Sequence, residues 1–451
     1  MRSGFLLLLA LVLIPVTALR GQDVQPQENG SQPRAKPTVV QPLSLDDAIR
    51  IALQGHPALR EAEDAVAAAE AEVKQARANY FPQLSFSGIA KAGLSGATGA
   101  LGLPGFPASP FYRNLAYSAN LYWDIFDFGR TKHWVAAQRA LAESARFKSK
   151  QEQERVVLAV KHAYFSVLEA QGLQNLAEQT VEERKFTLRR ARASFEQGLQ
   201  SQMEVSLAES SVAEAEGSMA EARAAVGKGF AALRVAMGVE GAPEYSLQAP
   251  KTEVVTLPPL ESLVQDSMKD RPDAQAMDWK VRAFSEAAGL AHSERLPKID
   301  GFGAAGEGRF NGTTVKPEQQ NGVGALGLLI PVFTGGRLEA AQQEAKAELD
   351  GALATREQLK QQIRQEVTDV YYQLLEFVQR VRAADQQRMS ANEALRLAQA
   401  RYNMRLASFL DVLTAQVTKT AAETNYARTQ FDYDRARAEL EFATGQPAQH
   451  R

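Results

Sequence analysis

Two long stretches of the chain repeat apolar residues at alternating spacings of three and four, which is the pattern of a coiled-coil seam. The first seam lies in residues 160–195 and the second in residues 367–402. Their polar members are Gln174, Arg184 and Arg388. The pattern predicts long helices that each bury one narrow apolar stripe.

The flanking sequence allows these helices to be very long, because proline is absent from residues 111–242 and from residues 332–446. Helices of about 65 residues that begin at Arg130 and Arg337 would span roughly 100 Å. Each is predicted to reverse at a short turn, near Gly198 in one case and near Arg405 in the other. A compact enzyme fold cannot accommodate helices of this length.

The chain is duplicated. Pro57 recurs as Pro272, a spacing of 215 residues, whereas Gly238 recurs as Gly445, a spacing of 207. AYFSVL at residue 163 likewise matches VYYQLL at residue 370. The eight extra residues of the first copy lie in a loop before residue 129, and a loop that changes length while its flanks keep register is predicted to be a surface loop.

Between the short and the long helices, each copy carries two segments with strand character. The pairs are residues 82–95 with 114–127, and residues 297–309 with 322–334. In the first pair apolar and polar residues alternate, which predicts one apolar and one polar face. Such strands are long enough to cross a bilayer when tilted. Four strands cannot close a barrel, so closure in lipid requires other chains, and three copies would supply 12 strands. A soluble pair of hairpins beside a coiled coil is the alternative.

The two copies and the chain ends give the predicted organisation. Short helices are predicted to start each copy, the first after Ser44 and the second at Pro57, a favoured first position of a helix. The predicted segments are a signal peptide (1–21), a flexible arm (22–42), the first repeat (43–238), a linker (239–258), the second repeat (259–445) and a tail (446–451).

Composition excludes several classes of function. The 51 basic and 53 acidic residues are mixed along the chain, so it has no basic surface for nucleic acid. The absence of cysteine excludes disulfides, thiolate metal sites and cysteine nucleophiles. The five histidines are scattered without a metal-binding spacing. GFGAAG at residues 301–306 matches a dinucleotide-binding pattern but does not open a helix, so we interpret it as close packing of small residues. We therefore predict no cofactor, no metal and no enzymatic activity.

Several of these segments resemble the outer-membrane efflux protein family, the TolC-like exit ducts. The resemblance lies in SLDDAIRIALQGHPALREAE near the start, in the strand-to-helix junctions LYWDIFDFGR and GLLIPVFTGGR, and in RYNMRLASFLDVLTAQ at the second helical turn. It implies a mainly α fold with membrane β structure: a homotrimer with a 12-stranded β-barrel in the outer membrane of a Gram-negative bacterium and a long periplasmic α-barrel. It also implies two partners, a periplasmic adaptor protein and an inner-membrane pump.

The resemblance assigns roles to the two helical turns. Residues at which adaptor hairpins would dock are Gly198, Leu199, Gln200 and Ser201 in the first copy, and Arg405, Leu406, Ala407 and Ser408 in the second. Arg405 replaces a glycine that is common in the family, so either the geometry of its turn or the adaptor preference of the second copy is expected to differ. Three residues match the gate of the entrance: Glu204, Tyr402 and Asp411.

Two interpretations of the acidic residues remain open. Asp411 could contribute to a ring of charge at the pore entrance, or it could cap a helix, because Ser408 and Asp411 have capping-box spacing. For Glu204, which has the same spacing from Ser201, we favour the cap. Two other functions also remain as alternatives: a secreted structural coiled coil or adhesin, and a periplasmic adaptor.

Overall fold

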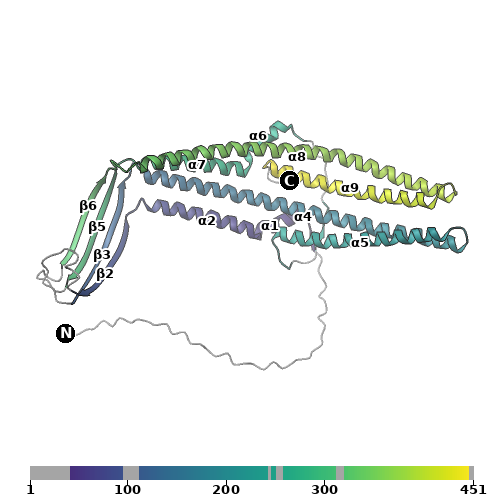
Figure 1. Ribbon diagram of the computed structural model, residues 1–451, viewed down its shortest axis with the longest axis horizontal. Coiled ribbons are helices and arrows are strands. Elements are labelled where there is room, and N and C mark those ends of the chain that lie inside the picture. The colour runs from purple at the N-terminus through teal and green to yellow at the C-terminus, as the bar shows by residue number, and fades with distance from the viewer. Residues whose placement is uncertain (1–40, 95–110, 242–244, 250–256, 311–318, 446–451) are drawn as a thin grey trace, which may run out of the picture.

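In the computed structural model, long helices run side by side from a four-stranded sheet at one end to two helical turns at the other (Figure 1). The structure describes residues 41–94, 111–241, 245–249, 257–310 and 319–445. The helices are α1 (Leu45–Gly55), α2 (Pro57–Ala78), α4 (Arg130–Glu196), α5 (Gln202–Met237), α6 (Leu260–Asp270), α7 (Pro272–Ser293), α8 (Arg337–Asn403) and α9 (Phe409–Ala443). The strands are β1 (Gln41–Leu43), β2 (Gln83–Leu94), β3 (Phe111–Phe126), β4 (Tyr245–Leu247), β5 (Lys298–Phe310) and β6 (Gln319–Leu329).

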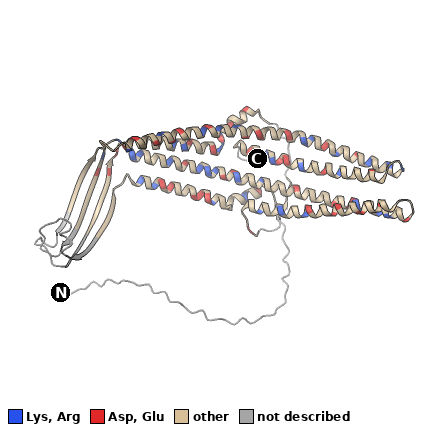
Figure 2. Cartoon of the chain, viewed as in Figure 1, with Lys and Arg blue, Asp and Glu red and all other residues tan. Residues whose placement is uncertain are grey.

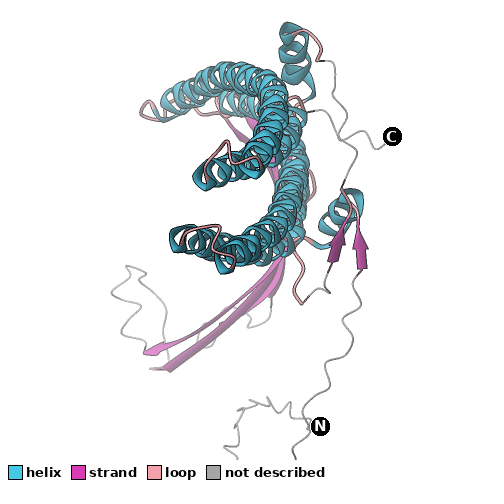
Figure 3. Ribbon diagram, turned by 90° about the vertical axis from the view of Figure 1, so that its right-hand side faces the viewer, coloured by secondary structure: helices cyan, strands magenta, loops and turns pink. Residues whose placement is uncertain are grey.

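Helices α4 and α8 confirm the predicted long helices, since each has 67 residues. Shorter helices complete the layer: α2 and α7 pack beside them near the sheet, whereas α5 and α9 pack beside them toward the turns (Figure 1). Seen end on, the helices form an open arc with a concave inner face (Figure 3). Basic and acidic residues are intermixed along the long helices, as the mixed charge of the sequence predicts (Figure 2).

In each copy the shorter helices meet at a contact, here called the joint, in which the glycine after one helix packs against the residue before another. The backbone geometry of the joint is the same in both copies. The end of α5 lies against the start of α2, and the end of α9 lies against the start of α7. A Cβ on Gly238 would lie 2.9 Å from the Cα of His56, and a Cβ on Gly445 would lie 2.9 Å from the Cα of Arg271. Both glycines have positive φ, 68° and 61°. Only glycine satisfies the left-handed conformation and the close approach together.

The four longer strands form one antiparallel sheet in the order β2-β3-β5-β6. The two predicted hairpins therefore lie beside each other, with β3 paired to β5. β6 ends at Leu329, whereas the sequence predicted a strand to residue 334. Pro331 lacks the N–H that would continue the ladder, which explains the earlier end. Within the described residues β2 and β6 are the outer strands, and each has one unpaired edge.

Each face of this sheet has its own chemistry. One face carries exposed apolar side chains, with Leu84 and Phe86 at 75% and 74% exposure and Leu121, Trp123 and Leu326 beside them. The other face carries hydroxyl, amide and charged groups together with the apolar Phe302 and Val323. There Ser87 Oγ lies 2.9 Å from Ser118 Oγ and accepts a hydrogen bond from Asn120 Nδ2. The predicted alternation of the first strand pair is confirmed.

The seams lie inside the helical layer. Val160, Val167, Val367 and Leu374 are buried, as the coiled-coil pattern predicts. A second, two-stranded sheet pairs β1 with β4 in parallel, so the segment predicted as a linker contains β4. Tyr164 holds this pair because its hydroxyl lies 2.9 Å from the Leu43 carbonyl oxygen and 2.7 Å from the Gln248 carbonyl oxygen, and it accepts from the Gln248 N–H at 3.1 Å.

The predicted signal peptide, most of the arm, the C-terminal tail and the extra loop of the first copy lie outside the described residues. Among the described helices, none combines the length and apolarity needed to cross a membrane as a helix.

Candidate functional site

The residues to which the sequence assigned a function all lie at the end of the molecule farthest from the sheet, in the turns α4–α5 and α8–α9 (Figure 1). The two turns have the same backbone. The Leu199 N–H donates to the Ser194 carbonyl oxygen at 2.9 Å, and the Leu406 N–H donates to the Arg401 carbonyl oxygen at 2.8 Å. Gly198 and Arg405 both adopt positive φ, 71° and 60°. The expectation that Arg405 alters the turn geometry is therefore wrong: the arginine adopts the left-handed conformation that glycine adopts more readily.

The helices that follow the turns begin differently. At α9 the Ser408 side chain accepts from the Asp411 N–H, and the Asp411 carboxylate accepts from the Ser408 N–H at 2.7 Å. This is a complete capping box. The two hydrogen bonds from Ser408 to the carboxylate lower the pKa of Asp411. At α5 the Ser201 side chain makes no capping hydrogen bond. The capping interpretation is thus confirmed for Asp411 and wrong for Glu204.

Glu204 instead belongs to a polar group around Tyr402. The Tyr402 hydroxyl accepts a hydrogen bond from Gln200 Nε2 across the two turns. Burial raises the pKa of Tyr402, and the negative charge of Glu204 raises it further. Glu204 Oε2 and Gln200 Oε1 are both shielded from solvent, and neither has a hydrogen-bond partner in the described part of the chain. The structure therefore brings Gln200, Glu204 and Tyr402 together and places Asp411 apart from them, in its own cap.

A small apolar cluster supports this group. Ala191, Val205 and Ala208 from the first hairpin contact Phe409 and Leu413 from the second. The Tyr402 and Phe409 rings lie 5.9 Å apart between centroids. The two helical hairpins are thus in contact with each other close to their turns.

The turns themselves expose apolar side chains to solvent. Leu199 and Leu406 occupy equivalent positions and are 60% and 63% exposed. Met203 and Met404 are exposed beside them. A pair of equivalent exposed leucines at the tips offers a surface on which another protein can bind.

A polar contact that the sequence analysis missed lies farther along α4. The buried guanidinium of Arg184 donates to Gln416 Oε1 on α9, and Gln416 Nε2 donates to Thr187 Oγ1 at 3.1 Å. Lys419 Nζ lies 2.5 Å from Glu183 Oε1.

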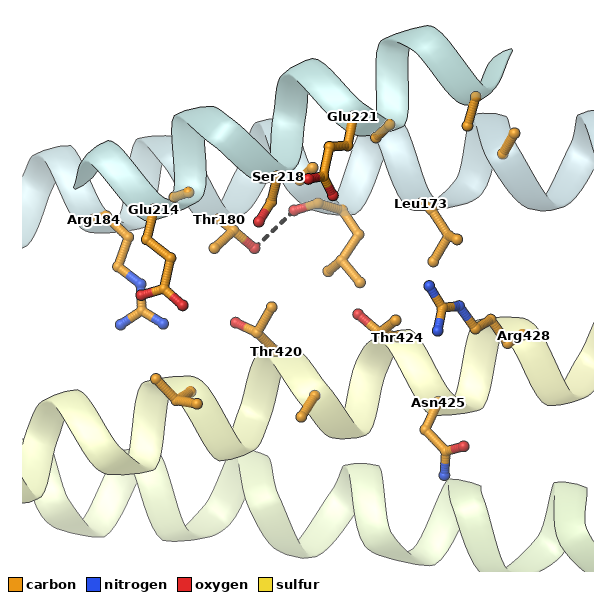
Figure 4. Close-up of a pocket in the computed structure, with 18 of the residues that line it drawn as sticks. Leu173, Thr180, Arg184, Glu214, Ser218, Glu221, Thr420, Thr424, Asn425 and Arg428 are labelled. Atoms are coloured by element: carbon orange, nitrogen blue, oxygen red, sulfur yellow. Dashed lines mark hydrogen bonds between the residues drawn. The ribbon is translucent and has the colours of Figure 1, made fainter. Parts of the chain in front are cut away.

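Beside Arg184 is a groove of about 710 Å³ between α5 and α9, with α4 as its floor (Figure 4). Its labelled residues include two arginines and two glutamates, Arg184, Arg428, Glu214 and Glu221. Arg184 was recognised only as a polar interruption of the seam, because its partner on α9 follows from the tertiary fold.

The motifs set aside in the sequence analysis have structural positions. Residues 301–306 lie within β5, where Gly301 and Gly303 pack against the Ile125 and Leu121 side chains. His56 caps α2 by accepting from the Ala58 N–H, and His133 lies 2.8 Å from Glu286. No group of three or more potential metal ligands occurs among the described residues.

Comparison with known families decides which fold family this architecture represents. The model of the outer membrane efflux protein family matches residues 48–239 and 263–446. The chain belongs to the outer membrane efflux protein family. The match covers both copies in order, as the resemblance in the opening helices and strand-to-helix junctions predicted.

Characterised relatives agree with this membership. The probable efflux pump outer membrane protein TtgC of Pseudomonas putida is 25% identical over 377 residues, which cover 83% of this chain and 77% of TtgC. The multidrug resistance outer membrane protein MdtQ of Escherichia coli is 22% identical over 417 residues, which cover 89% and 85%. The chain is therefore an efflux protein of the outer membrane of a Gram-negative bacterium, with a large periplasmic portion. This membership decides against the adhesin and adaptor alternatives.

Solved structures share the fold. The CmeC outer membrane channel of Campylobacter jejuni superposes with a TM-score of 0.78 at 16% identity, covering 94% of each chain. A membrane protein from Pseudomonas aeruginosa gives a TM-score of 0.77 at 22% identity, covering 93% of this chain and 99% of its own. The predicted fold of the single chain, long helical hairpins with four strands, is confirmed.

Proposed function

We propose that this efflux protein is one protomer of a homotrimeric exit duct that passively conducts solutes or polypeptides from the periplasm to the exterior, without catalysis. The three sheets close a 12-stranded barrel in the outer membrane, and the helices form an α-barrel in the periplasm. A periplasmic adaptor docks at the helical turns and couples the duct to an inner-membrane pump. The duct thus serves as the outer component of a tripartite efflux or type I secretion system.

The open sheet is the observation that supports this proposal most strongly. It is apolar on one face and leaves the edges of β2 and β6 unpaired within the described residues. In lipid each unpaired N–H or C=O group costs several kcal/mol, so an apolar sheet of four strands needs partners at both edges. Identical copies supply complementary edges in register around a closed ring. Three copies of four strands give a barrel of 12, within the known range.

The oligomeric state tests this assembly. The protein extracted in mild detergent should behave as a particle of three chains, measured by native mass spectrometry. A monomer that stays dissolved without detergent would overturn the proposal.

The turns are proposed as the adaptor-docking surface because they expose equivalent leucines. Leu199→Ser with Leu406→Ser should abolish capture of the periplasmic adaptor and leave the trimer intact. A matched control is Leu397→Ser, an exposed leucine of α8 that lies away from the turn. Unchanged capture by the double variant would remove the assignment.

The gate is proposed at Glu204, Tyr402 and Asp411. The Gln200–Tyr402 hydrogen bond and the cluster around Phe409 hold the two hairpins together at the entrance. Opening then requires the hairpins to separate at this point. Tyr402→Phe removes the accepting hydroxyl and should raise single-channel conductance in planar bilayers, whereas Tyr372→Phe, on an exposed part of α8, should not. Equal conductance in both variants would contradict the gate.

The charge of Asp411 can be separated from its capping role. Asp411→Asn keeps an oxygen acceptor for the cap but removes the charge, whereas Ser408→Ala weakens the cap and keeps the charge. If Asp411 contributes to a ring of charge, only Asp411→Asn should weaken block by multivalent cations. The opposite pattern would leave capping as its sole role.

A further inference from the structure

Three charged side chains of the sheet lie together at one end of it. Among the strand residues whose side chains the structure describes, only Asp124, Lys298 and Asp300 are charged, and all three lie at the end of the sheet nearest the helices. The close placement of these three groups indicates that they act together.

The three groups form a compact network. Asp124 and Asp300 face each other directly across β3 and β5. Lys298 Nζ lies 3.6 Å from Asp124 Oδ1 and 3.8 Å from Asp300 Oδ1. It also donates to the Tyr122 hydroxyl at 2.9 Å, and that hydroxyl donates to Asp124 Oδ1 at 2.8 Å. Two carboxylates directly opposite each other repel, and one lysine offsets only one of the two charges.

The neighbouring strand leaves room for the Asp300 carboxylate. Gly327 pairs with Asp300 across β5 and β6. A Cβ at residue 327 would lie 3.0 Å from Asp300 Oδ2, so any larger residue would press on this oxygen. Asp300 is thus flanked by Asp124 on one side and by a glycine on the other.

The network lies on the polar face. In the strand alternation, Asp124 shares its face with Asn120 and Tyr122, whereas Leu121 and Trp123 point to the apolar face. In a membrane barrel the apolar face contacts lipid and the polar face lines the lumen. This step rests on the proposed trimeric duct.

We infer that Asp124, Lys298 and Asp300 form a charged collar around the lumen at the base of the barrel, and that this collar favours the passage of cationic solutes over anionic ones. Each chain contributes two carboxylates and one ammonium group, a net charge of −1, so three chains contribute −3. A ring of acidic residues favours cations in a pore. The collar lies at the opposite end of the long helices from Asp411 and acts independently of it.

Ion selectivity of the full-length protein in planar bilayers tests the collar. The readout is the reversal potential in a KCl gradient. Asp124→Asn with Asp300→Asn should lower the ratio of potassium to chloride permeability, and Lys298→Gln should raise it, each by roughly twofold at low salt. Asn120→Ala on the same face is the uncharged control and should change nothing. The shifts should also occur in an Asp411→Asn background and shrink in concentrated salt, where the charges are screened.

The opposite signs separate selectivity from a structural role, because distortion of the sheet would not shift the ratio in opposite directions. Unchanged ratios, or shifts in the same direction, would overturn the collar. If the double variant does not assemble, Lys298→Gln against Lys298→Arg, which keeps the charge, decides the question with the same readout. Failure of the unaltered protein to form any channel would count against the proposed duct. Channels whose permeability ratio does not change when these three side chains are replaced would count against the collar alone.

Discussion

The two copies of the repeat have nearly the same backbone but differ in the chemistry at equivalent positions. The first turn uses Gly198 and leaves Ser201 without a side-chain cap, whereas the second uses Arg405 and a capping box. The joint of the first copy meets His56, and that of the second meets Arg271, whose guanidinium binds Asp273 and Glu366. The comparison shows that the fold needs the backbone conformation at these points and that the side chains are free to acquire separate roles.

The joints should be the most sensitive positions. Gly445→Ala places a Cβ against the Arg271 backbone and forces a left-handed alanine, which should destabilise the protein by about 2–4 kcal/mol. Gly238→Ala should cost a similar amount because its Cβ would lie equally close, 2.9 Å, to the backbone of His56. Gly351→Ala in α8, where a Cβ meets nothing within 4 Å, is the control. Thermal unfolding measures all three, and tolerance of Gly445→Ala would show that the joint is not closely packed.

A buried carboxyl offers a second contrast between the copies. Burial raises the pKa of Glu154 to about 7, and repulsion from Asp273 contributes. The equivalent residue of the second copy, 207 positions later, is the neutral Gln361. A raised pKa favours the protonated form in the folded state, so its contribution to stability is present at acid pH and is lost as the pH rises through about 7.

Glu154→Gln should therefore stabilise the protein at pH 8, on the order of 1 kcal/mol after allowance for solvent screening. At pH 4 it should have little effect. Unfolding temperatures of the variant and the unaltered protein at the two pH values give the comparison, and an equal difference at both would contradict the assignment.

The caps should differ between the copies as well. Ser408→Ala removes a capping hydrogen bond and should cost about 1 kcal/mol, whereas Ser201→Ala should cost almost nothing. The Asp411 part of the cap has a lowered pKa. Its contribution is present above the ordinary aspartate pKa and is lost in acid as the pH falls through the lowered value. The effect of Ser408→Ala should thus diminish in strong acid, and equal effects of the two serine variants at neutral pH would refute this contrast.

The turns should show the smallest effect. Arg405→Gly relieves a left-handed arginine and should stabilise by about 1 kcal/mol or less, and Gly198→Ala should destabilise by a similar amount. A Cβ on Gly198 would meet nothing within 4 Å, so only backbone conformation is involved. Chemical denaturation measures both, and destabilisation by Arg405→Gly would indicate that the arginine side chain itself supports the turn.

The sequence predicted most of the fold because its signals were local and repeated. The heptad seams predicted α4 and α8, and the alternation of residues 115–125 predicted β3. The sequence did not predict side-chain partners that meet only through tertiary contacts. Gln416 and Lys419 meet α4 only after the two hairpins pack, and no spacing reveals such partners. The end of β6 was misplaced because apolar residues continue past Pro331.

The same limit applies to the candidate site. Capping-box spacing was present at both Ser201 and Ser408, but it produced the hydrogen bonds only at Ser408. At the first turn Glu204 lies close enough to Tyr402 to raise its pKa, a contact between residues about 200 positions apart. Spacing therefore identified two candidate caps, and the fold decided which of them forms.

Cross-linking between strand edges tests barrel closure by several chains most directly. The chain has no cysteine, so introduced cysteines are unambiguous. One cysteine would replace Ser85 on β2, and a second would replace each residue from 322 to 328 of β6 in turn. Within one chain these edges are three strand spacings apart, about 14 Å, which is too far for a disulfide. We predict that β6 of one chain pairs with β2 of the next and that oxidation at matching positions yields covalent trimers in denaturing gels. Monomers at every position, from protein in its native membrane, would contradict the closed barrel.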